Sequence, residues 1–241
     1  MVSDLDIDTF IYYKNEINTK SQLGVFENKI VEIPNFIDAT TAQNLIQYFE
    51  NGPEKWGPIA FYGSFGMGLN PDSEELSKFN LDASIFEKIN NKTKDAVENI
   101  FNVAVKPNTS HAQKWVTGGF AYPHSDNSDF DGNPTAFEIN KYVAILYLND
   151  EYTGGILRFP EHNLDIKPNK LSIYIMPGGI ENIHEVREIL SGERHTMLSF
   201  WDFADADYSE ERKAQWAAEL EEVRASQAQQ REEWENGNKY A

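Results

Sequence analysis

Two stretches in the first hundred residues carry apolar positions at helical spacing. The clearer stretch runs from residue 82 to 101, and its apolar positions are Ile85, Phe86, Ile89, Val97, Ile100 and Phe101. This period predicts an amphipathic helix that packs against a sheet. A strand at 30–33 and a second helix that ends near Asn51 and Gly52 should precede it, with Asp38 or a following threonine as the cap. The segment after Gly52 is rich in glycine, proline and aromatic residues, which favours a loop.

After Pro107 the pattern changes to short β runs, at residues 142–148, 156–159, 171–176 and 194–203. Turn sequences separate them, at residues 154–155, 167–169 and 177–179. Many short strands with frequent turns are typical of a sandwich or jelly roll and disfavour a parallel sheet with crossover helices. Residues 208–235 then read as a helix whose apolar stripe is Trp216, Leu220 and Val223. Three positions are too few for sustained heptads, so we expect the stripe to dock on its own domain, with a dimer seam as the alternative.

Composition indicates one domain with extensions. A chain of 241 residues is large enough for a sizeable core. We divide it into supporting elements at 1–106, a core at 107–204 and a helical extension at 205–241, and expect a monomer or weak dimer. The chain has no cysteine, which excludes disulfides and thiolate chemistry. The acidic start shows no signal-peptide pattern and no apolar run suits a membrane, so a cytoplasmic protein is expected.

The net charge of −18 and the isoelectric point near 4.6 oppose binding to nucleic acid. The same charge would attract a basic protein partner, such as one associated with ribosomes or nucleic acid.

Four residues could carry metal chemistry. On a strand, residues two apart share a face, so His124 and Asp126 could bind one metal ion. The distant His184 could be the third ligand. Two imidazoles and one carboxylate form the facial triad associated with non-haem Fe(II). Arg194 suits a carboxylate of an organic co-substrate, because its planar fork matches that group with two hydrogen bonds. A bare His-x-Asp pair is common by chance, so it carries little weight without its surroundings.

The remaining histidines look structural or solvated. His111 and His162 lie in polar, turn-like surroundings, and His195 should point away from its neighbour Arg194 on a strand.

The sequence segments around these residues resemble those of a known protein family. Residues 115–126, 144–150, 154–160 and 183–201 are similar, in that order, to the core strands of the 2-oxoglutarate- and Fe(II)-dependent oxygenases of the prolyl 4-hydroxylase type. The resemblance covers about residues 112–204, and its last block is the most specific.

The resemblance implies a double-stranded β-helix, a jelly roll in a mainly β chain with packed helices. It implies that His124, Asp126 and His184 ligate Fe(II), that Arg194 pairs with the 5-carboxylate of 2-oxoglutarate, and that Tyr147 donates to the same co-substrate. Thr196 shares the strand face of Arg194 and could add a hydrogen bond. The implied reaction consumes O2 and 2-oxoglutarate, releases succinate and CO2, uses ascorbate as reductant, and hydroxylates a prolyl residue in a peptide or protein.

Several positions depart from the family pattern. Trp115 stands where a tyrosine is common, and Ala121 stands where an aromatic residue precedes the first metal histidine, with Tyr122 one step later. Either Phe200 or Trp201 could face the pocket. The segment 127–135 could be a mobile flap or a solvated turn, and its acidic residues Asp129 and Asp131 are weaker ligand candidates than the strand-borne pair.

Three alternatives stay open. An oxygenase of the same class could act on another residue or on a free amino acid. A jelly-roll module could bind a metal or a carboxylate without catalysis. A hydrolytic or nucleic-acid-modifying metalloenzyme is disfavoured by the acidic charge and by Arg194.

Overall fold

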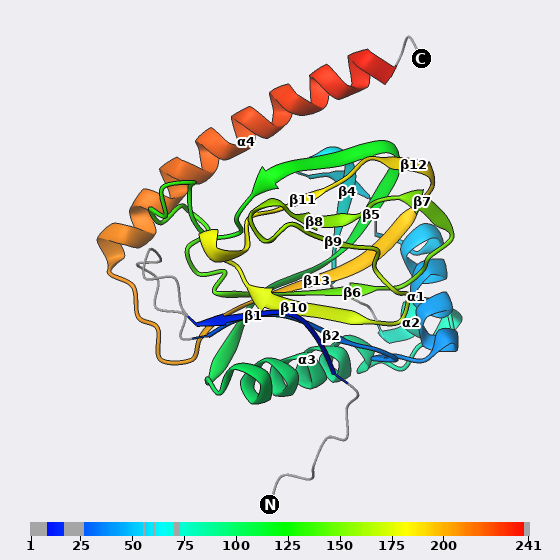
Figure 1. The fold of residues 1–241 in the computed structure, drawn as a ribbon. Coiled ribbons are helices and arrows are strands. Elements are labelled where there is room, and N and C mark those ends of the chain that lie inside the picture. Colours follow the sequence, from blue (N-terminus) through cyan, green and yellow to red (C-terminus); the bar gives the residue numbers. More distant parts are fainter. Residues whose placement is uncertain (1–8, 17–26, 55, 60, 70–72, 239–241) are drawn as a thin grey trace, which may run out of the picture.

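The computed structural model describes residues 9–16, 27–54, 56–59, 61–69 and 73–238. The N-terminal residues 1–8, on which the signal-peptide prediction rests, lie outside them. Two layers of antiparallel strands form a curled half-barrel, and helices cover the outer face of the larger layer (Figure 1). The prediction of a mainly β jelly roll with packed helices is confirmed. In the described part of the chain, no helix is long and apolar enough to cross a membrane.

The larger layer contains eight strands. Six follow the order β1, β2, β10, β6, β13, β5, and β4 and β3 extend it beyond β5. Their bounds are Phe10–Glu16 (β1), Glu27–Ile33 (β2), Gly57–Pro58 (β3), Tyr62–Gly68 (β4), Val105–His124 (β5), Tyr142–Tyr147 (β6), Ile173–Pro177 (β10) and Arg194–Phe203 (β13). Strands β3 and β4 fall in the segment predicted as a loop, so that prediction is wrong. The glycines of this segment weaken its strand pattern, but β3 and β4 form a hairpin that pairs with β5.

The smaller layer begins at the end of β5 and continues through β11, β8 and β9, and β7 and β12 form a separate pair. The bounds are Tyr152–Gly154 (β7), Leu157–Phe159 (β8), Leu164–Ile166 (β9), His184–Val186 (β11) and Ile189–Gly192 (β12). Two 3-10 turns, Pro160–His162 (η1) and Ile180–Asn182 (η2), connect strands of this region.

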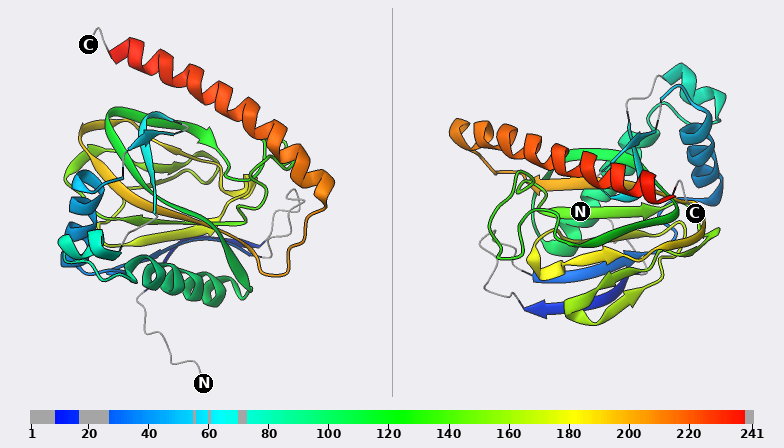
Figure 2. Two further views of the ribbon diagram at one scale, coloured as in Figure 1. Left: turned by 180° about the vertical axis from the view of Figure 1, so that it is seen from behind. Right: turned by 90° about the horizontal axis from the view of Figure 1, so that it is seen from above.

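Helices Ala39–Asn51 (α1), Ser73–Lys78 (α2) and Ile85–Phe101 (α3) pack on the larger layer, as Figure 2 shows from behind and from above. The predicted cap is present, since the Asp38 carboxylate accepts the Thr41 N–H at 2.9 Å. Strand β6 is buried on both faces. Tyr142, Ala144 and Leu146 contact the helix-side core, and the alternate residues belong to the core between the layers. A strand covered on both sides reads as a continuous apolar run.

Strand β5 belongs to both layers. From Val105 to Trp115 it pairs with β13, and at Ala121 and His124 it pairs with β11. The change of layer follows Gly118, whose φ of 83° favours glycine. The register between β5 and β11 also slips, so Ala121 and His124 both face inward although they are three residues apart.

A side chain at Gly119 should disturb this bend. A Cβ there would lie 2.9 Å from the carbonyl oxygens of Gly63 and Val116, which are backbone atoms. Gly119→Ala should therefore lower the free energy of unfolding by about 2 kcal/mol, within the usual range for a strained core substitution. The matched control is Gly68→Ala, because a Cβ at Gly68 meets nothing within 4 Å. Urea denaturation would measure both, and equal stabilities would contradict the steric argument.

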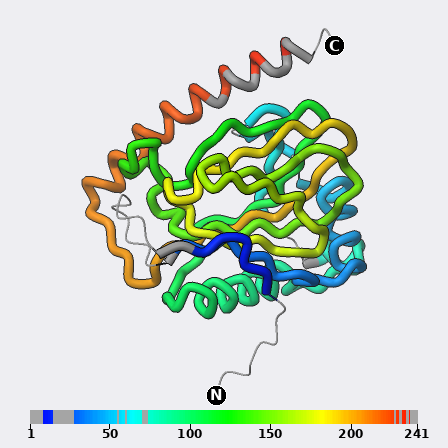
Figure 3. The backbone as a smooth tube through the Cα atoms, viewed as in Figure 1, coloured from blue at the N-terminus to red at the C-terminus, as the bar shows by residue number. Residues whose placement is uncertain are grey.

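The last helix, Glu210–Asn238 (α4), lies along the outside of the barrel (Figure 3), and near its far end Glu233 accepts a hydrogen bond from the Tyr62 hydroxyl of β4 at 3.4 Å. Its first turns are held by Glu138, a buried carboxylate that accepts from Arg212 Nε at 2.6 Å and from Trp216 Nε1 at 3.0 Å. Trp216, Leu220 and Val223 are half-buried. The predicted apolar stripe of α4 is therefore partly covered, and it includes Trp216, which donates to Glu138.

Removing the cation at Arg212 should release this end of α4. Arg212→Met leaves the buried Glu138 carboxylate without its charged partner, which typically costs several kcal/mol. Hydrogen exchange of the amides between residues 212 and 223 should accelerate at least about tenfold, the ratio that corresponds to about 1.4 kcal/mol. Lys213→Met, which removes only an exposed pair with Glu210, should leave the exchange rates unchanged. Unaltered exchange in Arg212→Met would contradict the docking role.

Candidate active site

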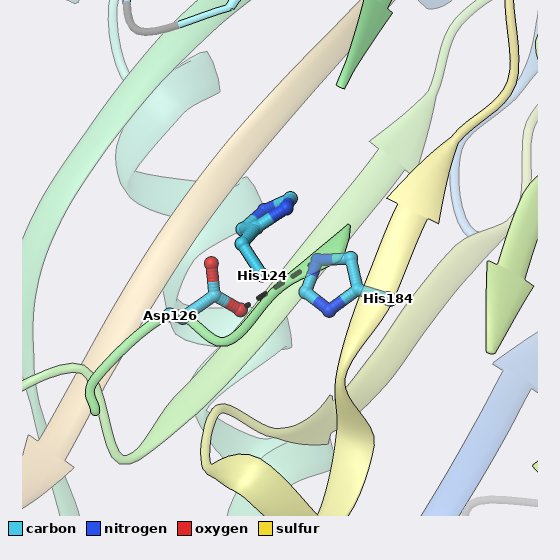
Figure 4. Close-up of side chains that lie close together, drawn as sticks. All are labelled: His124, Asp126 and His184. Carbon is cyan, nitrogen blue, oxygen red and sulfur yellow. Dashed lines mark ion pairs between the residues drawn. The ribbon is translucent and has the colours of Figure 1, made fainter. Parts of the chain in front are cut away.

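His124, Asp126 and His184 lie together between the two layers (Figure 4). His124 ends β5, Asp126 follows in the adjoining turn, and His184 begins β11 directly opposite His124. The two imidazole centroids are 4.4 Å apart, and His184 Nε2 lies 3.9 Å from Asp126 Oδ2. One ligand atom from each residue lies within 4.8 Å of the others, so the three side chains could hold one metal ion. Pairing of β5 with β11 thus closes the sixty-residue gap in the sequence.

Backbone carbonyls fix the orientation of both histidines. Nδ1 of His124 lies 2.8 Å from the Tyr122 carbonyl oxygen, and Nδ1 of His184 lies 2.9 Å from that of Asn182. A carbonyl oxygen can only accept, so each Nδ1 carries the proton and donates it. Each Nε2 then keeps its lone pair for a metal, which is how an outer hydrogen bond selects the tautomer of a ligating histidine.

The Asp126 carboxylate lacks a partner for one oxygen. Its Oδ2 is buried and accepts no hydrogen bond, while its backbone N–H is held by the Gly178 carbonyl oxygen at 2.8 Å. Burial raises the pKa of Asp126 to about 6 and lowers the pKa values of His124 and His184 to about 4. At neutral pH two neutral imidazoles and one carboxylate face each other. A divalent cation matches this donor set and would satisfy the orphaned oxygen.

Aromatic rings enclose the histidines. Phe61 lies 4.6 Å from the His124 ring and stacks on Trp115 with centroids 5.9 Å apart, and Phe159 lies 5.8 Å from His184. Phe61 therefore connects the His124 side of the interior with the part of β5 that pairs with β13. These rings exclude water from the sides of the site and strengthen its electrostatic interactions.

Arg194 begins β13 opposite Trp115 and is 2% exposed. Its guanidinium carbon lies 4.7 Å from the centroid of the Trp115 ring and 5.6 Å from that of Tyr147. One amino group donates to the Gly155 carbonyl oxygen at 3.3 Å, but the buried Nε–H has no partner. A buried guanidinium without full hydrogen bonding suits a carboxylate ligand, which forms paired bonds with it.

Tyr147 and Thr196 lie opposite each other on β6 and β13. Both are buried, and burial raises the pKa of Tyr147 while Arg194 opposes the rise. The Thr196 hydroxyl lies 3.5 Å from the carbonyl and side-chain oxygens of Gln113, a long hydrogen bond. The structure thus brings Tyr147 next to Arg194 and places Thr196 two residues along the same strand, while their roles stay predictions.

A second group of possible ligands contains Glu50, Glu193 and His195. His195 faces away from Arg194, as predicted, and its Nε2 lies 2.8 Å from a Glu50 oxygen. The Lys114 ammonium lies 2.9 Å from the other oxygen of Glu50. Because a lysine already supplies positive charge there, we interpret this group as a structural ion-pair network.

The other predictions near the site have mixed outcomes. His162 lies in η1 and stacks on Tyr13, as a structural residue would. The turn-like setting predicted for His111 is wrong, because this residue lies inside β5, and burial lowers its pKa. Phe200 packs against the core between the layers, whereas Trp201 packs on the helix side.

The segment 127–135 is a hydrogen-bonded turn, and its role as a mobile flap stays a prediction. Asp129 accepts from the backbone N–H groups of Asp131 and Asn133. Neither Asp129 nor Asp131 belongs to a possible metal-binding group among the described residues.

Three contributors had no signal in the sequence. Phe61 lies in the segment predicted as a loop, Tyr152 begins the short strand β7 just before the predicted turn at 154–155, and Asn182 acts through its backbone carbonyl. An aromatic residue beside a turn has no distinctive spacing. Only pairing of the strands reveals where it points.

No protein-family model matches the chain. Human prolyl 3-hydroxylase 3 is 29% identical over 116 residues, which cover 43% of this chain and 15% of the human protein. Chicken prolyl 3-hydroxylase 1 is 33% identical over 89 residues, which cover 34% of this chain and 12% of that protein. The matches therefore span a small part of these curated relatives.

Solved structures match over most of the chain. The viral collagen prolyl hydroxylase vCPH from Paramecium Bursaria Chlorella virus-1, in its 2OG complex, has a TM-score of 0.50 and 16% identity, with coverage of 73% of this chain and 96% of that one. A Trichoplax adhaerens prolyl hydroxylase, in complex with a hypoxia inducible factor peptide fragment, has a TM-score of 0.52 and 15% identity, with coverage of 77% and 86%. A Burkholderia pseudomallei oxidoreductase of the 2OG-Fe(II) oxygenase family has a TM-score of 0.51 and 16% identity, with coverage of 72% and 84%.

At these identities the likeness shows the fold. The chain therefore has the jelly-roll fold of the 2OG-Fe(II) oxygenases, and prolyl hydroxylases are among its structural neighbours.

Proposed function

We propose that this chain is a 2-oxoglutarate- and Fe(II)-dependent dioxygenase that hydroxylates a prolyl residue in a peptide or protein. The main support for the proposal is that the interior of the protein contains both a group of possible metal ligands and a buried cation. His124, Asp126 and His184 offer a metal one face of ligands, and Arg194 is a buried cation without a full set of partners. Phe61 lies against both His124 and the Trp115 beside Arg194, which supports the proposal that the two sites are neighbours.

The donor set fits Fe(II) and a keto acid. The two Nε2 atoms and the Asp126 carboxylate would hold the metal and leave its other positions open. Arg194 would pair with the far carboxylate of 2-oxoglutarate, with Tyr147 as a second donor and Thr196 beside them. When bound, the metal and the keto acid would supply the oxidising power for hydroxylation with O2, and 2-oxoglutarate would be converted to succinate and CO2. Ascorbate would serve as a reductant that keeps the iron ferrous.

The protein's own residues orient and shield this chemistry. The carbonyls of Tyr122 and Asn182 hold the histidine rings by their Nδ1–H groups. Phe61 and Phe159 lie against those rings and keep water away from them.

A peptide substrate is supported by an aromatic surface that β4 and the end of β5 form. Tyr62, Phe120 and Tyr122 form a cluster of rings, in which Tyr62 stacks on Phe120 at 4.6 Å and meets Tyr122 edge-on at 5.6 Å. Tyr122 is 57% exposed. Aromatic surfaces of this kind bind proline-containing peptides. The names of the matched proteins, which include a collagen prolyl hydroxylase and a prolyl hydroxylase with a bound peptide, agree with this substrate class.

The net charge of −18 further favours a basic peptide. Binding of a basic proline-containing peptide should weaken as salt concentration rises. Affinity that is independent of salt would contradict an electrostatic contribution.

The experiment combines purified protein with Fe(II), 2-oxoglutarate, ascorbate and a panel of proline-containing peptides, followed by mass spectrometry. The expected product is a peptide heavier by one oxygen atom, with the addition on proline in the fragment spectrum. Omission of 2-oxoglutarate is the matched control and should remove the product. Addition of oxygen to another residue would contradict prolyl hydroxylation but would still support oxygenase activity. Absence of metal and keto-acid binding would contradict the class itself.

A further inference from the structure

Three hydrogen-bond donors around Arg194 are buried and have no hydrogen-bond partner among the residues that the structure describes. They are the Nε–H of Arg194, the indole N–H of Trp115 and the hydroxyl of Tyr152. Buried polar groups in folded proteins are nearly always hydrogen-bonded, so three orphaned donors in one place indicate a ligand that accepts from them. The guanidinium and the indole can only donate. The ligand must therefore bring acceptor atoms, and a carboxylate brings two oxygens and the charge that balances Arg194.

Tyr152 is held beside the guanidinium by the backbone. A Cβ at Gly155 would lie 3.0 Å from Tyr152 Cε2, so the tyrosine ring packs against this glycine. The carbonyl oxygen of Gly155 in turn accepts from Arg194. Gly155 has a φ of +62°, which favours glycine and lets the ring approach the backbone.

Trp115 also lies beside the guanidinium. Its ring lies against the guanidinium, and it belongs with Tyr152, Ala121 and Val186 to one apolar cluster. Apart from its hydroxyl, Tyr152 makes the contacts that a phenylalanine would make. A phenylalanine would fill the space without burying an unpaired O–H, so packing alone does not account for a tyrosine there.

We propose that Tyr152 and Trp115 bind the far carboxylate of the keto acid together with Arg194, and that these three donors select a co-substrate with a second carboxylate. The identity of this ligand as 2-oxoglutarate rests on the proposed function. The three-donor pocket goes beyond it, because it assigns recognition to Tyr152 and Trp115.

The test measures ligand binding by calorimetry to protein loaded with Mn(II) under nitrogen, where no turnover interferes. The ligands are 2-oxoglutarate and oxalate, because oxalate can chelate the metal but has no far carboxylate. Tyr152→Phe should weaken 2-oxoglutarate binding about tenfold, the loss expected for one hydrogen bond to a charged group. It should leave oxalate binding unchanged. Trp115→Phe, which keeps a ring beneath the guanidinium, should show the same split between the ligands.

Tyr208→Phe is the matched control, because this tyrosine donates to Asp202 in another part of the protein. It should bind both ligands as the wild type does. Equal weakening of both ligands in Tyr152→Phe would assign the hydroxyl a general structural role and overturn the inference. Unchanged 2-oxoglutarate binding in Tyr152→Phe would also overturn it, while the proposed function would stand. If the wild-type protein binds neither ligand, the proposed function fails with it.

Discussion

Replacing His184 with alanine should reduce 2-oxoglutarate turnover to the background rate and weaken Fe(II) binding at least about 100-fold. The estimate is a lower bound, because changes to residues that merely support a metal ligand already cost about 10- to 100-fold. The physical reason is the geometry, since His184 contributes the Nε2 that faces Asp126 across 3.9 Å. Calorimetric titration with a divalent metal under nitrogen and an assay of succinate would measure the two effects separately.

His111→Gln is the control for this experiment. His111 is a half-buried histidine on the same long strand as His124, but it lies outside the possible metal-binding groups. It should keep the metal affinity of the wild-type protein. Wild-type metal binding in His184→Ala would remove this residue from the ligand set.

Replacing Arg194 with methionine should raise the 2-oxoglutarate concentration required for half-maximal binding about 100-fold and leave metal binding intact. Truncating one member of a buried, hydrogen-bonded charge pair costs about 2 to 5 kcal/mol, and 100-fold corresponds to about 2.7 kcal/mol. Methionine retains much of the apolar stem of the arginine side chain, so the protein should remain folded. Titration of metal-loaded protein with 2-oxoglutarate under nitrogen measures this effect.

Arg187→Met provides the comparison for charge alone, because Arg187 is half exposed and lies near Glu185. It removes the same formal charge without touching the buried pocket, and its 2-oxoglutarate affinity should match the wild type. Equal affinities in Arg194→Met and the wild-type protein would contradict the carboxylate role.

The sequence predicted the elements whose apolar period is long or complete. Helix α3 and strands β6 and β13 agree closely with prediction because each buries a regular set of side chains. The hairpin of β3 and β4 was missed. It contains Gly57, Gly63, Gly66 and Gly68, and glycine weakens the strand signal even where pairing with β5 fixes the backbone.

The candidate site was partly readable for a similar reason. His124, Asp126, His184 and Arg194 carry recognisable chemistry, and the resemblance orders them along the chain. Phe61 and Tyr152 carry no such chemistry in the sequence, and their places depend on the bend of β5 and on contacts through Gly155. Tertiary pairing decides these positions, and one sequence does not contain that information in any local pattern.

The bend in β5 also explains how one strand serves two sites. Before Gly118 the strand presents Trp115 beside Arg194 in the larger layer, and after it His124 meets His184 in the smaller layer. The proposed carboxylate-binding residues and the candidate metal ligands are therefore connected by a single continuous strand. A keto acid that joins them would be held at both ends by rigid elements, which is what precise positioning requires.

The most direct test of the oxygenase proposal is succinate formation by the purified protein. Protein, Fe(II) and 2-oxoglutarate would be combined under nitrogen with a proline-containing peptide found to bind, and then exposed to air, with His184→Ala in parallel. The result expected of oxygenase activity is one succinate for each 2-oxoglutarate consumed, only in the presence of Fe(II) and air, and none above background from His184→Ala. Failure of the wild-type protein to bind Fe(II) and 2-oxoglutarate, or equal succinate from both proteins, would contradict it.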